Sequence, residues 1–211
     1  MNVIQYFLKH PNEILQATVE HISLVAAAML IAVAIGVPLG ILVARRPWLA
    51  KPILGTANIA ETIPSLALFG FLLPVPWLGE RAARLAIAAL TLYALLPIIR
   101  NTAAGIAGVD PAVREAARGM GMTQRQILFK VELPLSLSTV LAGIRVATVL
   151  TIGIATIAAA VGAGGLGEYI FRGLAMVNDS LILAGAIPAA LLALAADFLL
   201  SVLERRLRPA R

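Results

Sequence analysis

The sequence predicts an all-α integral membrane protein with about five transmembrane helices. Hydrophobic residues make up 60% of the 211 residues and charged residues only 13%, and the mean hydropathy of +0.93 excludes an ordinary soluble domain. Several apolar stretches reach the roughly 20 residues that a helix needs to cross a hydrocarbon core of about 30 Å. The formal charge of +6 is carried mainly by the segments expected in the cytoplasm, so it does not indicate an affinity for nucleic acid.

The N-terminal segment, residues 1–20, is mixed in polarity and lacks the features of a secretory signal. We expect it to lie outside as an interfacial helix that leads into the first span, 21–44. Basic residues directly after this span mark the cytoplasmic side and place the N-terminus outside: Arg45, Arg46 and Lys51. His10 and His21 have no clustered carboxylate partner, so both are expected to be solvated or interfacial.

The second predicted span, 52–75, is interrupted by a polar cluster that includes Glu61, Thr62, Pro64 and Ser65. An acidic residue at membrane depth is costly, so it must face the bundle interior or a water-filled path. Pro64 removes a backbone hydrogen bond and frees carbonyl groups that could line a cavity. The cluster is therefore a candidate part of a translocation path, and a structural hydrogen bond between helices is the alternative.

Three further spans are predicted at 85–99, 135–161 and 181–203. Arg145 and Asp197 lie at matched depth just inside the cytoplasmic ends of the last two. Charges at matched depth can neutralise each other in a medium that solvates ions poorly, so we expect them to pair. With five spans, the excess of basic residues on one side predicts an external N-terminus and a cytoplasmic C-terminus.

A glycine-rich segment, 162–180, joins the last two spans on the outside. It contains a G-x-G-x-x-G match that begins at Gly162, but no strand precedes it, which argues against a dinucleotide site. The glycines are instead expected to let the fourth helix end and turn back as a short external helix over residues 168–174.

Residues 110–134 form a polar island between apolar runs. Asp110 is a predicted N-cap, and Pro111 occupies the first helical position, where its missing N–H costs nothing. Gly119 and Gly121 can supply the left-handed conformation that ends a helix. Apolar residues recur at helical spacing and form a narrow stripe, available to a partner: Val113, Ala116, Ala117 and Met120.

A second short helix is predicted to follow in the island. Thr123 and Gln126 have the spacing of a capping box. The helix is expected to end at Leu133, because the residue before Pro134 avoids the helical region. The alternatives for the island are an ordinary interhelix loop or a DNA-binding helix-turn-helix, and the membrane-length flanks argue strongly against the second.

The spacing within the island resembles the EAA loop of ABC-importer permeases. Glu115-Ala116-Ala117 is followed after three residues by Gly121 and after nine more by Val131-Glu132-Leu133-Pro134, with valine where the pattern usually has isoleucine. In that family the loop is the cytoplasmic coupling element, and its short helix docks in a groove of the ATPase subunit. The resemblance implies that residues 101–134 have this role, with these coupling residues: Glu115, Ala116, Ala117, Gly119, Gly121, Leu133 and Pro134.

Three further segments are similar to the osmoprotectant branch of these permeases, which imports glycine betaine, choline, carnitine or related quaternary amines: 62–74, 92–111 and 142–171. The resemblance implies a single permease domain over residues 1–211, with the five-helix core also found in methionine importers. It further implies a homo- or heterodimer of permeases in the bacterial inner membrane, with two ATPase subunits and a separate substrate-binding receptor. The receptor is expected to dock on external loops that include Gly164, Gly165, Gly167 and Glu168.

The sequence lacks several motifs that are typical of catalytic or nucleotide-binding sites. Cysteine is missing, which excludes a disulfide framework and a thiolate nucleophile. No G-x-x-x-x-G-K-[ST] occurs, so ATP and Mg²⁺ are expected in the partner ATPase, and no cofactor is expected in this chain. The remaining alternatives are a methionine, phosphonate or sulfonate permease, or a self-contained ion-coupled carrier that uses Glu61 and Asp197. No catalytic pattern supports an intramembrane enzyme.

Overall fold

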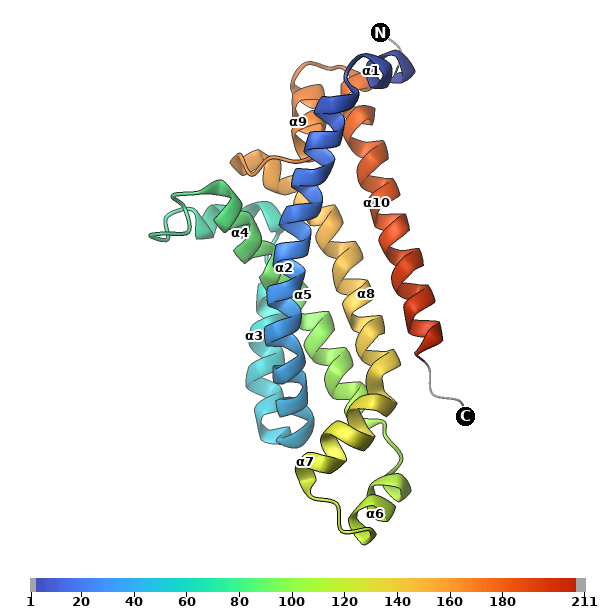
Figure 1. The fold of residues 1–211 in the computed structure, drawn as a ribbon. Coiled ribbons are helices and arrows are strands. Elements are labelled where there is room, and N and C mark those ends of the chain that lie inside the picture. The colour runs from blue at the N-terminus through green and yellow to red at the C-terminus, as the bar shows by residue number, and fades with distance from the viewer. Residues whose placement is uncertain (1–2, 208–211) are drawn as a thin grey trace.

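The computed structural model describes residues 3–207, which form an elongated bundle of helices (Figure 1). Four helical segments of this part of the chain are long and apolar enough to cross a membrane: α2 (Pro11–Arg45), α5 (Ala82–Ala107), the segment Gln124–Val161, which contains α8 (Leu133–Ala158), and α10 (Asp179–Arg206). No strand occurs among the described residues, and the all-α membrane fold is thus confirmed. The outermost residues of the predicted domain, 1–2 and 208–211, lie outside the described residues.

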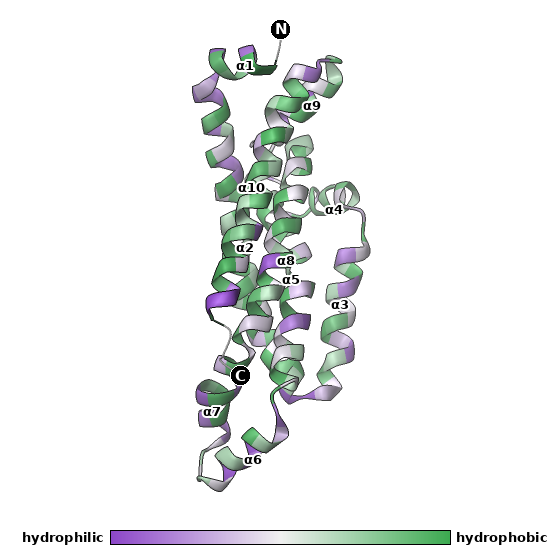
Figure 2. Cartoon of the chain, turned by 90° about the vertical axis from the view of Figure 1, so that its right-hand side faces the viewer, coloured by the Kyte–Doolittle hydropathy of each residue, from purple (hydrophilic) through white to green (hydrophobic). Residues whose placement is uncertain are grey.

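The predicted second span is two short helices rather than one long one. After the 3-10 turn η1 (Pro47–Leu49), α3 covers Ala50–Thr62 and α4 covers Ser65–Leu72. Ile63 and Pro64 between them have extended backbones, because proline cannot donate a helical hydrogen bond and disfavours a helical residue before it. The interruption expected from the sequence is therefore a complete break. Hydrophilic residues recur along α3, in contrast to the long helices (Figure 2).

The N-terminal segment is helical, and the helix of the first span begins earlier than predicted. α1 covers Val3–Lys9, and α2 starts at Pro11 rather than at residue 21. Ile14 and Ala17 of this added part are buried, while Glu13 is exposed, so an amphipathic stretch extends the apolar run. The prediction of a solvated or interfacial His21 is wrong. Its side chain is completely buried, and Nε2 lies 3.1 Å from the carbonyl oxygen of Ile152.

Small residues allow the central helices to pack closely. A Cβ at Gly40 of α2 would lie 2.5 Å from Thr102 of α5, and a Cβ at Gly143 of α8 would lie 2.5 Å from Asn101. The core consequently lies between α2, α5 and α8. α10 packs on one side of this group, against α8 and α9 (Gly167–Ala175), and its outer surface carries large apolar side chains: Leu191, Leu194 and Phe198.

The prediction that a helix ends at Leu133 is wrong. α7 (Gln124–Ile127) continues through a π-helical turn, η2 (Leu128–Glu132), directly into α8. In the π turn the N–H of Leu133 bonds to the carbonyl of Leu128, five residues back. The wider turn accommodates Pro134 in the first turn of α8, where a missing N–H is tolerated. The fourth helical segment therefore begins ahead of the predicted residue 135.

Candidate functional site

The short helix α6 (Pro111–Gly119) projects from one end of the bundle, together with α7 (Figure 1). Asp110 is its N-cap, as predicted, because the side chain accepts a hydrogen bond of 2.8 Å from the N–H of Ala112. The helix ends with Gly121 at a φ of 77°, and Met122 N–H bonds back to Ala117 at 3.1 Å, which is a Schellman ending. Gly119 is the last helical residue and not left-handed. The predicted capping box of α7 is also confirmed.

The apolar stripe of α6 is divided between the protein and its surroundings. Ala117 is buried against its own chain, whereas Val113, Ala116 and Met120 are exposed, and Met120 retains 74% of its accessible surface. Glu115 is exposed on the same helix. Small side chains next to exposed apolar ones allow another protein to approach the helix closely. Of the other predicted coupling residues, Leu133 and Pro134 lie in the first turn of α8.

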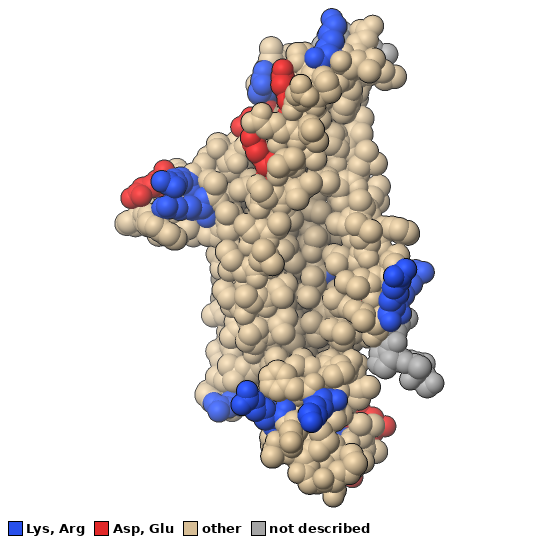
Figure 3. Space-filling view, viewed as in Figure 1, with Lys and Arg blue, Asp and Glu red and all other residues tan. Residues whose placement is uncertain are grey.

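A group of charged residues that sequence reasoning missed connects this end to the bundle. We call it the Glu132 cluster, and it consists of Arg45, Arg114 and Glu132. Arg45 lies 2.5 Å and Arg114 3.2 Å from separate oxygens of the Glu132 carboxylate. The only sequence signal was an acidic residue directly before an apolar span, among many other charges. Figure 3 shows basic side chains gathered at this end of the molecule.

The break between α3 and α4 holds the candidate path residues. Thr62 and Pro64 are exposed, and Glu61 and Ser65 are half-buried. The hydroxyl of Thr62 donates to the carbonyl of Ile59 at 2.9 Å, within its own helix. Tyr93 of α5 donates its hydroxyl hydrogen to the carbonyl of Ile63, one of the groups next to the break. A hydrogen bond between helices is therefore present, but it uses the backbone rather than Glu61.

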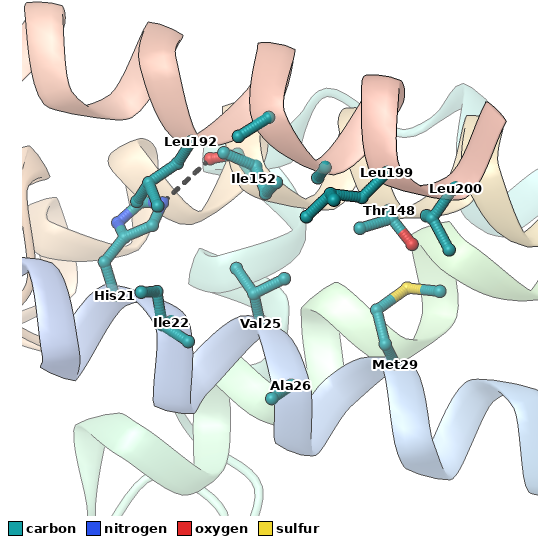
Figure 4. A pocket seen from close by; sticks show the side chains of 12 residues that line it. His21, Ile22, Val25, Ala26, Met29, Thr148, Ile152, Leu192, Leu199 and Leu200 are labelled. Carbon is teal, nitrogen blue, oxygen red and sulfur yellow. Dashed lines mark hydrogen bonds between the residues drawn. The ribbon is translucent and has the colours of Figure 1, made fainter. Parts of the chain in front are cut away.

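A cavity of about 190 Å³ lies between α2, α3 and α5, beside the break, and Thr56 and Ala60 are among its lining residues. A larger cavity of about 380 Å³ lies between α2, α8 and α10 (Figure 4). Its walls are almost entirely apolar. His21 stands at one end of this larger cavity and bonds to the carbonyl of Ile152. Neither cavity is lined by a charged residue that could bind an ionic ligand.

A second charged group joins α8 to α10, and we call it the Arg145 cluster: Arg145, Asp197 and Glu204. The structure brings the sequence-predicted pair together, with Arg145 Nε 3.1 Å from Asp197 Oδ1. It also adds Glu204, whose Oε2 accepts a hydrogen bond of 3.2 Å from Arg145 Nη1. Glu204 escaped sequence reasoning because it lies at the end of the helix, among other charged residues, where a charge needs no partner.

The glycine-rich segment forms the opposite end of the molecule, beside α1 (Figure 1). α8 ends at Ala158, the 3-10 turn η3 (Ala159–Val161) follows, and positive φ values reverse the chain before α9: Gly162, Gly164 and Gly165. The N–H of Gly165 donates to Glu20 of α2 at 3.3 Å. A Cβ at Gly167 would lie 1.9 Å from the carbonyl oxygen of Thr156, so this position requires glycine. The predicted short helix is present as Gly167–Ala175.

Polar side chains of α2 and α9 line a small cavity of about 180 Å³ at this end: Glu13, Gln16, Glu20, Glu168 and Arg172. Beside it, Tyr6 and Tyr169 make an edge-to-face contact with ring centres 6.3 Å apart. Burial raises the pKa of both tyrosine hydroxyls above the ordinary value. The contact fixes α1 against α9.

Known proteins resemble the chain over nearly its whole length. A family model described as "Binding-protein-dependent transport system inner membrane component" matches residues 36–209. The carnitine transport permease protein OpuCB of Listeria monocytogenes is 43% identical and covers 98% of this chain and 94% of its own length. The osmoprotectant import permease protein OsmW of Salmonella typhimurium is 44% identical, and the match covers 99% of this chain and 98% of the relative. The choline transport system permease protein OpuBB of Bacillus subtilis is 41% identical, and the match covers 99% of this chain and 95% of the relative.

The fold has solved relatives as well. A structure of the MetNI methionine ABC transporter in an inward-facing conformation matches with a TM-score of 0.84 and 24% identity, over 95% of this chain and 98% of that one. At this identity the likeness concerns the fold, which agrees with the methionine-importer-like core expected from the sequence. The family match, by contrast, rests on sequence over most of the chain. The chain belongs to the family of binding-protein-dependent transport system inner membrane components.

Proposed function

We propose that this chain is the permease subunit of an ATP-driven importer for quaternary-amine osmoprotectants, and that it has no catalytic activity of its own. The observation that carries the proposal is the identity of 41–44% to permeases named for carnitine, osmoprotectant and choline transport, over almost the entire chain. Aromatic residues are only 5% of the sequence, so a cation–π cage is better sought in a separate receptor than in this chain. The permease then supplies a weakly binding passage.

The proposed coupling element is α6 with the residues that follow it. A separate ATPase subunit binds ATP and Mg²⁺, and its closure pushes on α6 through Glu115, Ala116 and neighbouring residues. The exposed apolar side chains of α6 support this role, because a docking helix needs a surface that its own chain leaves uncovered. The push rocks the long helices between inward and outward access.

The proposed path runs along the break between α3 and α4. Glu61, Thr62, Pro64 and Ser65 contribute to it, together with a second permease copy, identical or related. The exposure of Thr62 and Pro64 supports this placement, since polar groups beside a helix break need water or a partner chain within a membrane. The carboxylate of Glu61 at the break attracts a cation but binds it only weakly, because the site is not enclosed.

We further propose a bacterial inner membrane location with the N-terminus outside. α1 and α9 lie at the end opposite to α6 (Figure 1), and basic side chains gather at the α6 end (Figure 3), which supports a cytoplasmic position for α6. The receptor then docks at the end formed by α1 and α9, near Gly164, Gly165, Gly167 and Glu168.

The test is uptake of labelled glycine betaine by proteoliposomes that contain this chain, its ATPase and its receptor. Uptake is expected to need ATP and all components, and to collapse when Glu115 or Gly121 is substituted in an intact complex. Glu80→Gln is the matched control, because Glu80 is an exposed carboxylate in the loop between α4 and α5. Uptake by this chain alone, driven by an ion gradient, would establish the carrier alternative. Uptake of methionine, a phosphonate or a sulfonate in place of betaine would show that the chain belongs to an importer for that substrate instead.

A further inference from the structure

One buried carboxylate joins α6 to the membrane bundle. The side chain of Glu132 is only 6% exposed, and it contacts arginines from two different helices. Arg45 is the last residue of α2 and lies 2.5 Å from Oε2. Arg114 belongs to α6 and lies 3.2 Å from Oε1. Glu132 itself ends the π turn η2, so three elements that are distant in the sequence meet at a single side chain.

The two arginines extend this joint to two more segments. Arg45 donates to the side-chain oxygen of Gln124 at 2.8 Å, in the first turn of α7. Arg114 donates to the carbonyl of Ala107 at 3.2 Å and to that of Ile106, both at the C-terminal end of α5. Two arginines against one carboxylate leave an excess positive charge. The end of α5 balances it, because the last carbonyls of a helix carry the negative end of its dipole.

The π turn η2 is a position at which the helix can bend, and the Glu132 cluster lies directly on it. π-helical turns are local departures from the α-helix and often mark functional positions. The turn η2 lies between α7, which follows α6 in the chain, and α8, which is long and apolar enough to cross the membrane. A hinge at this turn would absorb a push on α6 before it reached the long helices. The ion pairs of Glu132 oppose such bending, since separating a buried carboxylate from its partners leaves uncompensated charges.

We propose that Glu132 is a positioning residue of the transport reaction. It locks the π turn and fixes α6 to the ends of α2 and α5, so that a push on α6 moves the long helices as one body. The inference rests on the proposed function, because it assigns a step in the transmission of force from an ATPase. Glu132 belongs to the coupling segment itself, but the resemblance assigned it no coupling role.

The first test compares Glu132→Gln with Glu80→Gln in the assembled complex of permease, ATPase and receptor. Transport and ATP hydrolysis are measured in the same proteoliposomes. The proposal predicts that uptake per ATP hydrolysed falls about tenfold in Glu132→Gln, a typical size for a lost coupling between two sites, because the π turn then bends before the long helices move. Hydrolysis per assembled complex is retained, since α6 still docks. Glu132→Asp keeps the charge and is expected to recover part of the loss, whereas Glu80→Gln behaves as the parent.

The second test measures the joint without transport. The chain contains no cysteine, so cysteines placed at the exposed positions Trp48 and Ala112 can carry spin labels at the end of α2 and on α6. Pulsed electron resonance on the complex is expected to give one narrow distance distribution in the parent and in Glu80→Gln. In Glu132→Gln the distribution broadens.

Two results would overturn the inference. One is an unchanged distance distribution in Glu132→Gln. The other is a loss of uptake and of hydrolysis per assembled complex in the same proportion, which would mean that Glu132 affects the ATPase itself rather than the transmission from α6 to the long helices. The distance measurement needs no substrate, so an error in the proposed function shows as absent uptake in the parent while the state of the joint is still measured.

Discussion

The Glu132 cluster and the Arg145 cluster contain the same kinds of residues in opposite proportions. In the first, a single acid, 6% exposed, lies between two arginines. In the second, a single arginine lies between Asp197, which is 49% exposed, and Glu204, which is 11% exposed. Arg145 keeps a partner when either acid is lost, but the loss of Glu132 leaves two arginines without their shared acid. The first cluster therefore depends on one residue, and the second contains redundancy.

The largest effect that can test this comparison is on stability. Glu132→Leu is expected to lower the free energy of unfolding by about 3–5 kcal/mol, because two partly buried arginines lose their counter-charge. Asp197→Asn should cost about 1 kcal/mol or less, since the carboxylate is half-exposed and Glu204 still neutralises Arg145. Unfolding of the two purified variants in a series of mixed detergents gives the difference. Equal losses would show that the two clusters do not differ in redundancy.

A charge exchange gives a smaller and more specific effect. Reversing both charges with Arg145→Asp and Asp197→Arg recreates the pair, but it also places the new acid near Glu204. We expect the double variant to recover most of the stability lost by either single reversal, with a remaining deficit of about 1 kcal/mol from two neighbouring like charges. Adding Glu204→Gln should remove that deficit in the same unfolding assay. Complete recovery without the third change would mean that Glu204 does not share Arg145.

The two clusters also differ in how well sequence predicts them. The sequence predicts the pair Arg145–Asp197, because a charge at membrane depth has few possible partners and both residues lie in apolar runs. Glu132 lies in a charged segment, and its partner Arg45 is 87 residues away in the sequence. Neither periodicity nor hydropathy selects one arginine among the many at that end. The pair between two apolar runs was therefore predictable from the sequence, whereas Glu204 at the end of its helix and Glu132 in a polar segment were not.

Local signals were reliable where a short segment determines its own geometry. The N-cap at Asp110 and the capping box at Thr123 depend on neighbouring residues alone, and both are present. Pro134 shows the limit of such rules, because the π turn ahead of it lets the helix continue. His21 shows another limit. Its burial comes from the carbonyl of Ile152 in α8 and the backbone of Gly165, which only the tertiary fold brings beside it.

The smallest predicted effect concerns how α6 presents Arg114 to the Glu132 cluster. Gly121 has a φ of 77° and ends the helix, so Gly121→Ala should destabilise this ending by about 1 kcal/mol, the cost of a left-handed L-residue. Gly119 is helical, and a Cβ there would meet no atom within 4 Å, so Gly119→Ala should stabilise α6 by up to about 1 kcal/mol.

Hydrogen exchange of the α6 amides is the measurement, with the amides of α8 around Arg145 as the internal reference. The two alanine variants are expected to change the exchange of α6 in opposite directions and to leave the reference unchanged. Exchange that rises in both variants would show that α6 needs small residues for packing rather than for its ending. Exchange that stays unchanged in both variants would instead show that the Glu132 cluster holds α6 in place regardless of how the helix ends, which would strengthen the dependence of this end on a single residue.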